Sequence, residues 1–125
     1  MKVTFLSALL SLFFLTSRAQ EQYMVVGTYD SPKSEGIYVF KFNTQTGETG
    51  LVSQVKTPNP SYLTVSADKK YVYAVNETTP GSVASFSFDP GTGTLSLLNA
   101  RSSGGNNPCY LALDKTGKWL TAGNY

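Results

Sequence analysis

The sequence offers one carboxylate in a position suited to chemistry. Glu77 follows Asn76 at the end of a predicted strand, where a carboxylate can take a proton from water or orient it. We expect hydrogen-bond donors on the same face of the fold as Glu77. These are side chains and loop N–H groups that can bind a substrate or a developing oxyanion. The candidate substrate-binding residues are Asn59, Asn76, Arg101, Asn106, Asn107, Asn124 and Tyr125. The alternative is that Asn76 and Asn124 satisfy backbone groups at strand ends and that Glu77 is solvated.

Composition excludes several other kinds of site. The 125 residues contain no His and one Cys, so they cannot form a His/Cys zinc site, a Ser-His-Asp or Cys-His catalytic set, or an internal disulfide. We expect no metal and no cofactor. The net charge of +2 disappears when Lys2 and Arg18 of the N-terminal segment are set aside. A neutral chain gives no electrostatic support for a nucleic-acid or anionic-membrane partner.

The segment Arg101–Asn107 is predicted to be a loop on the face of Glu77, and it carries the only arginine beyond the N-terminal segment. A guanidinium beside exposed backbone N–H groups suits a phosphate. The lysine and the following helix of a P-loop are lacking, however. The alternative is a flexible surface loop. Cys109 has no activating neighbour in the sequence and is interpreted as a small core residue.

The first nineteen residues are typical of a secretory signal peptide. Lys2 precedes the apolar stretch Val3–Leu15. Ser17 and Ala19 place small residues at the third position and the first position before a cleavage site between Ala19 and Gln20. The apolar stretch is shorter than the ~20 residues that cross a bilayer as a helix. The alternative is an uncleaved anchor or a buried helix. We expect export, to the periplasm or outside the cell, and no membrane span after removal of this segment.

The rest of the chain repeats itself. The aligned blocks are Tyr23–Tyr29 with Tyr71–Glu77 and Trp119–Tyr125, Asn59–Ser66 with Asn107–Asp114, and Gly36–Asn43 with Gly81–Asp89. The first two sets are offset by 48 residues and the third by 45, which assigns three extra residues to the loop Asp30–Glu35. The equivalent aromatic residues Tyr23, Tyr71 and Trp119 are expected to pack between repeats.

Each repeat is predicted to consist of strands. Short segments rich in Val, Tyr, Phe and Leu alternate with Gly, Pro and Asp turns, and no window has the 3.6-residue period of a helix. Four antiparallel strands every 48 residues are typical of a β-propeller blade. We predict an all-β propeller fold, with a partial blade over 20–57, a complete blade over 58–101 and a partial blade over 102–125. The main alternative is a β-sandwich, whose strands need not repeat at a fixed period.

The propeller topology explains why the polar loops are candidates for a site. Antiparallel strands alternate ends, so the joints at 58–60, 76–80 and 103–108 meet on one face of the blades. Ligand sites are concave, and that face lies over the central channel of a propeller. Glu77 and the Asn side chains of these joints therefore gather where a substrate would bind.

The residues also resemble a known family. The segments NPSYLTVSADKKYVYAVNE, GSVASFSFDPGTGTLSLLN and SSGGNNPCYLALDKTGKWLTAGNY, together with the opening YMVVGTY, are similar to the seven-bladed propeller lactonases related to bacterial 6-phosphogluconolactonase. The resemblance covers about 22–125. It implies hydrolysis of a sugar δ-lactone, typically 6-phospho-D-glucono-1,5-lactone, to the free acid without a metal. Relatives often carry His where Tyr110 stands here.

The resemblance further implies that the remaining blades belong to a longer chain. About two of seven blades are present, and the family takes the innermost strand of the first blade from the far C-terminus. The His, Arg and Glu residues usually proposed for the family's active site come mostly from later blades. We expect a lactonase acting on a small sugar lactone when the protein is complete, and an inactive fragment otherwise. The alternative is a non-catalytic envelope propeller that binds carbohydrate or protein.

The signal peptide leads to a first prediction. Cleavage after Ala19 should leave a mature N-terminus at Gln20, because the apolar stretch is short and small residues stand at the cut. Mass spectrometry of the exported protein measures this terminus directly. Retention of Met1 would contradict the prediction.

Overall fold

A computed structural model describes residues 21–125, and the predicted signal segment lies outside them. Nine strands and no helix occur in this range. The strands are β1 (Glu21–Gly27), β2 (Ile37–Asn43), β3 (Thr49–Val55), β4 (Leu63–Val65), β5 (Tyr71–Asn76), β6 (Ser82–Asp89), β7 (Thr94–Ser102), β8 (Pro108–Leu113) and β9 (Leu120–Asn124). Among these residues there is no helix with the length and apolar character needed to cross a membrane.

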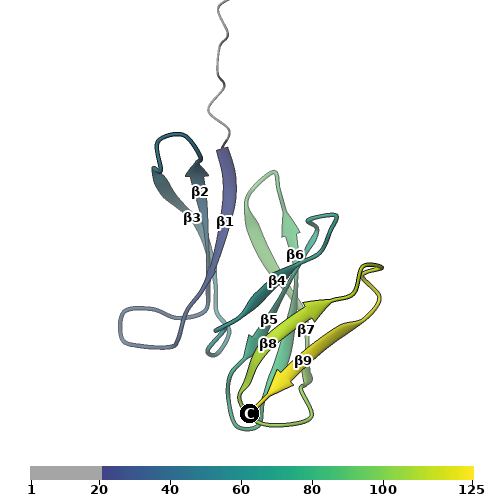
Figure 1. The fold of residues 1–125 in the computed structure, drawn as a ribbon. Helices are drawn as coiled ribbons and strands as arrows, with labels where there is room; N and C mark the ends of the chain where they lie inside the picture. The colour runs from purple at the N-terminus through teal and green to yellow at the C-terminus, as the bar shows by residue number, and fades with distance from the viewer. Residues whose placement is uncertain (1–20) are drawn as a thin grey trace, which may run out of the picture.

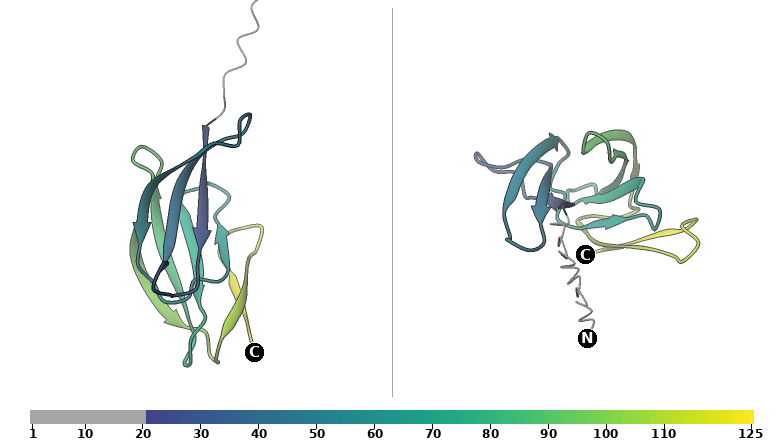
Figure 2. Two further views of the ribbon diagram at one scale, coloured as in Figure 1. Left: turned by 90° about the vertical axis from the view of Figure 1, so that its left-hand side faces the viewer. Right: turned by 90° about the horizontal axis from the view of Figure 1, so that it is seen from above.

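The strands form three antiparallel sheets. Their orders are β1-β2-β3, β4-β5-β6-β7 and β8-β9, so neighbours in the chain are neighbours in each sheet. The sheets stand side by side in chain order and fan out when seen from above (Figures 1 and 2). The prediction of an all-β fold of antiparallel sheets is confirmed, and the second sheet has the four strands expected of a complete blade.

The strand register corrects the alignment of the middle block. Gly27 pairs with Ile37 and Val75 pairs with Val83, so β2 and its equivalent β6 are offset by 46 residues rather than 45. The same β-bulge then falls before Phe40 in the first sheet and before Phe86 in the second. Backbone geometry therefore defines the repeat better than the glycines on which the alignment was based.

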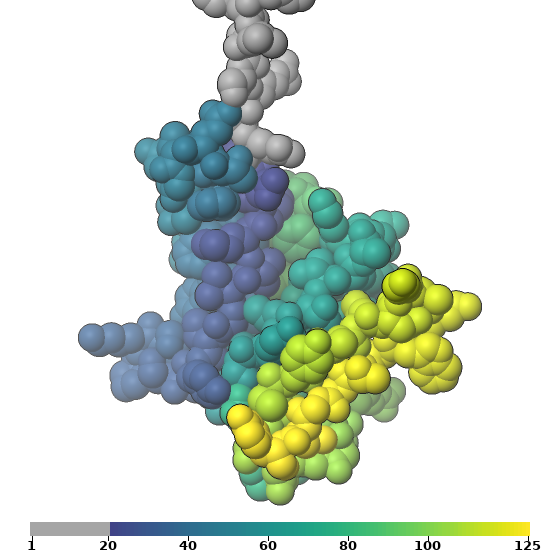
Figure 3. Space-filling model, viewed as in Figure 1, coloured from purple at the N-terminus to yellow at the C-terminus, as the bar shows by residue number. Residues whose placement is uncertain are grey.

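The main core lies between the first two sheets. Ile37 and Val39 of β2 are fully buried against the face of the second sheet that carries Ala84 and Phe86. Val72, Ala74 and Leu95 complete the buried cluster, with Leu63 packed against it. In the space-filling view the first two sheets meet along a continuous seam, and the β8–β9 hairpin lies across the front of the second sheet (Figure 3). Each sheet is therefore stabilised by its neighbour.

The tight turns of the second and third sheets share a pattern in which a hydroxyl and a carboxylate bind each other. The two residue types occupy opposite positions in the two turns. After β4, the Ser66 hydroxyl binds the Asp68 carboxylate, which also accepts from the backbone N–H of Lys70. After β8, the carboxylate precedes the hydroxyl in the sequence. Asp114 accepts from the Thr116 hydroxyl and from turn N–H groups. The Thr116 hydroxyl, followed by the N–H donors, lowers the pKa of Asp114 to about 2. The turn geometry is thus retained while its residues change.

The three equivalent aromatic residues behave differently from one another. Tyr23 packs between sheets as predicted, with its ring edge-on to Phe88 at 5.2 Å between centroids and its hydroxyl donating to the Pro90 carbonyl at 3.1 Å. Tyr71 is 39% exposed, so for Tyr71 the prediction is wrong. Trp119 is 73% exposed, and residues 21–125 contain no further sheet against which its packing could be tested.

A glycine at the end of β1 sets how closely the first two sheets approach. A Cβ added at Gly27 would lie 1.9 Å from the Pro60 carbonyl oxygen, a backbone atom that cannot swing away. Gly50 in β3 has open space around it, since a Cβ there would meet nothing within 4 Å. The two glycines therefore provide a matched pair for testing this contact.

We predict that Gly27→Ala destabilises the fold by about 1–3 kcal/mol or more, because the added methyl group must push the Pro60 segment away. Gly50→Ala should change the free energy of unfolding by less than about 0.5 kcal/mol, as surface substitutions generally do. Urea unfolding of the two variants and the unaltered protein measures both values. Equal stability of the two variants would show that Gly27 does not set the approach of the sheets.

Candidate functional site

The polar loops gather at one end of the sheets, as the alternation of antiparallel strands predicts. The loop after β5 lies between the segment before β4 and the loop before β8. Glu77 N–H donates to the Asn59 carbonyl at 3.1 Å, and Asn107 N–H donates to the Thr78 carbonyl at 2.9 Å. This end is the lower one in Figure 1, where the C-terminal residue also lies.

Glu77 is the centre of this face. It is half-buried, and one of its carboxylate oxygens, Oε2, accepts two hydroxyl donors. The Tyr29 hydroxyl donates to Oε2 at 2.8 Å, and the Ser61 hydroxyl donates to the same atom. Tyr29 follows β1 in the first sheet, whereas Ser61 precedes β4 in the second. The carboxylate therefore joins two sheets.

Asn59 holds the backbone around Glu77. Its side-chain Nδ2 donates to the Glu77 carbonyl at 3.3 Å, and its Oδ1 accepts from the Asp30 N–H at 2.9 Å. Its φ of 41° is in the left-handed region, which Asn tolerates better than most residues. Asn107, its equivalent in the next repeat, has a φ of 46°. The sequence proposed Asn59 as a substrate contact, and the structure gives it bonds to two loops of the site.

Asn76 faces into the blade. It is 5% exposed, its Oδ1 accepts from the Thr57 hydroxyl at 2.7 Å, and its Nδ2 donates to the Ser82 hydroxyl at 3.0 Å. Both partners are side-chain hydroxyls, so the Asn76 amide is occupied within the protein, but not by backbone groups as the alternative from the sequence had it. We therefore leave Asn76 out of the proposed substrate contacts.

The three later asparagines and Tyr125 lie on the same face and differ in exposure and hydrogen bonding. Asn107 Oδ1 accepts from the Thr79 hydroxyl at 3.3 Å, and Asn124 Nδ2 donates to the Ser103 carbonyl at 3.1 Å. The Asn106 side chain is exposed and makes no hydrogen bond with another described residue. Tyr125 is 89% exposed. Of these four, Asn106 and Tyr125 present the most accessible polar groups.

Arg101 is not in a loop. It belongs to β7, where it pairs with Val83, and the expected loop begins only after Ser102. The reason is that β6 continues to pair with β7 as far as Ser82. Arg101 lies two strands outward from β5, roughly 10 Å at a spacing of about 4.8 Å per strand. Its exposed side chain contacts no charged group among residues 21–125, and the structure does not bring it to Glu77.

Tyr29 and Ser61 were not singled out from the sequence. The signal was present, because Tyr29, Glu77 and Tyr125 occupy the same position in three successive repeats. The 48-residue period shows that these positions are equivalent. It does not show that equivalent positions touch across the boundary between two sheets.

Two other features of the described residues are less suited to chemistry. No group of three or more His, Cys, Asp or Glu side chains in the described residues could hold a metal ion. A hollow of about 520 Å³ lies between the turns that contain Asp68 and Asp114. Both carboxylates there already accept hydrogen bonds from their own turns. The Glu77 face is therefore the better candidate for chemistry.

The chain belongs to the seven-bladed β-propeller lactonase family, whose model matches residues 23–125. A 6-phosphogluconolactonase of Formosa agariphila is 42% identical over 107 residues, covering 82% of this chain and 30% of that protein. A Bacteroides fragilis crystal structure superposes with a TM-score of 0.79 at 46% identity, covering 88% of this chain and 31% of that one. The Pseudomonas aeruginosa periplasmic gluconolactonase gives a TM-score of 0.78 at 34% identity, covering 84% and 31%. The chain therefore spans about three-tenths of the length of these relatives.

The contact between Tyr29 and Glu77 predicts an unusual tyrosine titration. The hydrogen bond to Glu77 is the main cause that raises the pKa of Tyr29 above 10. A tyrosine whose pKa is higher in the folded state holds its contact fully below pH 10 and loses it as the pH rises through the higher value. The contact should therefore persist at neutral pH and break in strong alkali.

Ultraviolet absorbance of tyrosinate, measured as the difference between the unaltered protein and Tyr29→Phe, isolates this one titration among eight tyrosines. We expect the Tyr29 pKa above 10, and Glu77→Gln should return it toward 10, because the charged acceptor is removed. A Tyr29 titration that is the same before and after the Glu77→Gln substitution would show that the two side chains do not interact.

Proposed function

We propose that the protein to which these residues belong hydrolyses a sugar δ-lactone to the free acid. Membership of the lactonase family supports this reaction class. The observation that carries the proposal is the carboxylate of Glu77, which two hydroxyl donors hold on the face where propeller loops converge. In this proposal Glu77 is the general base, and residues of the further blades complete the site.

The chemistry needs a base, a donor for the oxyanion and a proton for the leaving group. Glu77 takes a proton from a water molecule, whose oxygen then attacks the lactone carbonyl carbon. The negative charge that develops on the carbonyl oxygen needs hydrogen-bond donors, and the accessible amide of Asn106 is one donor on this face. The bond from the carbonyl carbon to the ring oxygen then breaks, and the proton passes from Glu77 to the ring oxygen.

We also propose export before the enzyme acts. The segment 1–19 has the features of a signal peptide, and one relative of solved structure is named a periplasmic gluconolactonase. Arg101 lies away from Glu77, so the described residues do not supply it as a phosphate ligand of this site. Phosphorylated and unphosphorylated aldonolactones should therefore both be tested as substrates.

We predict that Glu77→Gln in the complete protein lowers kcat on the preferred aldonolactone by ~10²-fold or more, because general base catalysis commonly contributes that much. Glu48→Gln is the matched control, since Glu48 is also a carboxylate that accepts a hydroxyl, from Thr46 at 3.1 Å, but lies on an exposed turn. The control should keep the kcat of the unaltered enzyme. Lactone opening followed by pH indicator measures both.

Two outcomes would contradict the proposal. Unchanged turnover of Glu77→Gln would leave Glu77 as a structural link between two sheets, without a role in catalysis. Absence of activity in the unaltered protein, with both phosphorylated and unphosphorylated lactones, would favour the alternative of a propeller that binds carbohydrate or protein without catalysis.

A further inference from the structure

The two oxygens of the Glu77 carboxylate have different surroundings. Oε2 accepts from both Tyr29 and Ser61, whereas no donor of residues 21–125 binds Oε1. Two donors to one oxygen, one from each sheet, fix the position of Oε2 and thereby restrict the rotation of the carboxylate plane. The arrangement thus separates an oxygen that anchors the group from an oxygen that is open to a ligand.

The backbone that carries these groups is also fixed. Asn59 bonds to the backbone of Glu77 through its carbonyl and its side-chain Nδ2, and to the N–H of Asp30 through its Oδ1. Asp30 directly follows Tyr29 in the chain. One asparagine therefore sets the separation between the segment that supplies the Tyr29 hydroxyl and the segment that supplies the carboxylate.

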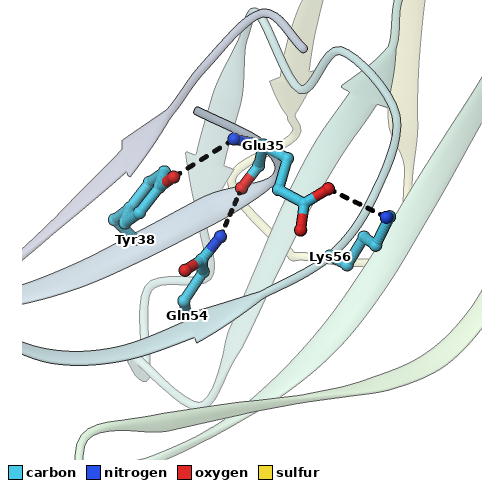
Figure 4. Close-up of polar contacts among 4 residues, drawn as sticks. All are labelled: Glu35, Tyr38, Gln54 and Lys56. Carbon is cyan, nitrogen blue, oxygen red and sulfur yellow. Dashed lines mark hydrogen bonds and ion pairs between the residues drawn. The ribbon is translucent and has the colours of Figure 1, made fainter. Parts of the chain in front are cut away.

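The loop that carries Tyr29 is fastened at its other end as well (Figure 4). The Glu35 N–H donates to the Tyr38 hydroxyl at 3.1 Å, and Gln54 Nε2 donates to the Glu35 carbonyl at 2.8 Å. The Glu35 carboxylate forms an ion pair with Lys56 at 2.8 Å. Within the loop, the Ser34 hydroxyl donates to the Tyr29 carbonyl at 3.0 Å. Tyr29 is 59% exposed, yet its backbone is held in place.

We propose that Tyr29 is a positioning residue for the base. This proposal rests on the proposed function. Together with Ser61, the Tyr29 hydroxyl holds Oε2 so that Oε1 faces the attacking water. Oε1 accepts the proton of that water, and the same proton is later given to the ring oxygen of the opened lactone. Tyr29 itself loses no proton in this sequence, because it donates to Oε2 throughout.

Tyr29→Phe in the complete protein tests this role, since it removes only the hydroxyl of an exposed side chain. We expect kcat to fall about 10-fold or more with KM within about twofold, because a base held less precisely is less effective. A purely structural role would leave kcat unchanged at temperatures well below the melting transition of the variant.

Tyr23→Phe is the matched control. It also removes one tyrosine hydroxyl that joins the first two sheets, in this case the bond to the Pro90 carbonyl at 3.1 Å, far along the blade from Glu77. Both variants should show similar small losses of melting temperature. Only Tyr29→Phe should change kcat.

The outcomes separate this inference from the proposed function. If Glu77→Gln is inactive while Tyr29→Phe keeps the kcat of the unaltered enzyme, Tyr29 is not a positioning residue and the proposed function stands. Equal losses of kcat in Tyr29→Phe and Tyr23→Phe would likewise assign Tyr29 to stability alone. An unaltered protein without lactonase activity would overturn both the function and the role of Tyr29.

Discussion

The fold depends on the contact between apolar faces of neighbouring sheets. Ile37 and Val39 are removed from water only because the second sheet presents Ala84 and Phe86 to them. A single sheet of three or four strands leaves such a face exposed and is correspondingly unstable. Gly27 then decides how near the sheets can come, since its missing side chain leaves room for the Pro60 carbonyl. The spacing of the polar loops at the end of the sheets follows from this packing.

The candidate site is a product of the same contact. Tyr29 belongs to the first sheet and Glu77 to the second, and their hydrogen bond spans the boundary between them. Asn59 reinforces the boundary with bonds to both loops. Stability and chemistry are therefore coupled here, because a change in the sheet packing also changes the orientation of the carboxylate. A site within one blade would not have this dependence.

Much of the fold could be predicted from the sequence, and less of the site. The 48-residue period and the turn residues identified the strands, because strand patterns and turns are local properties. The extent of β7 to Ser102 was missed, since Arg101 and its exposed neighbours have no apolar alternation to mark a strand. Glu77 could be chosen from its place after β5. Tyr29 could not, because its role requires knowing which loops of two sheets meet.

Equivalent positions of successive repeats contact one another in this protein. Tyr29 bonds to Glu77, and Tyr62 packs against Tyr110 with ring centroids 4.9 Å apart, each pair being 48 residues apart. The blades therefore meet head to tail, as subunits do in a ring. Exact copies of a blade would place two identical carboxylates side by side, and these would repel. An acidic group at this position requires the neighbouring copy to differ, so the asymmetry of the repeats is a condition for having a single oriented carboxylate.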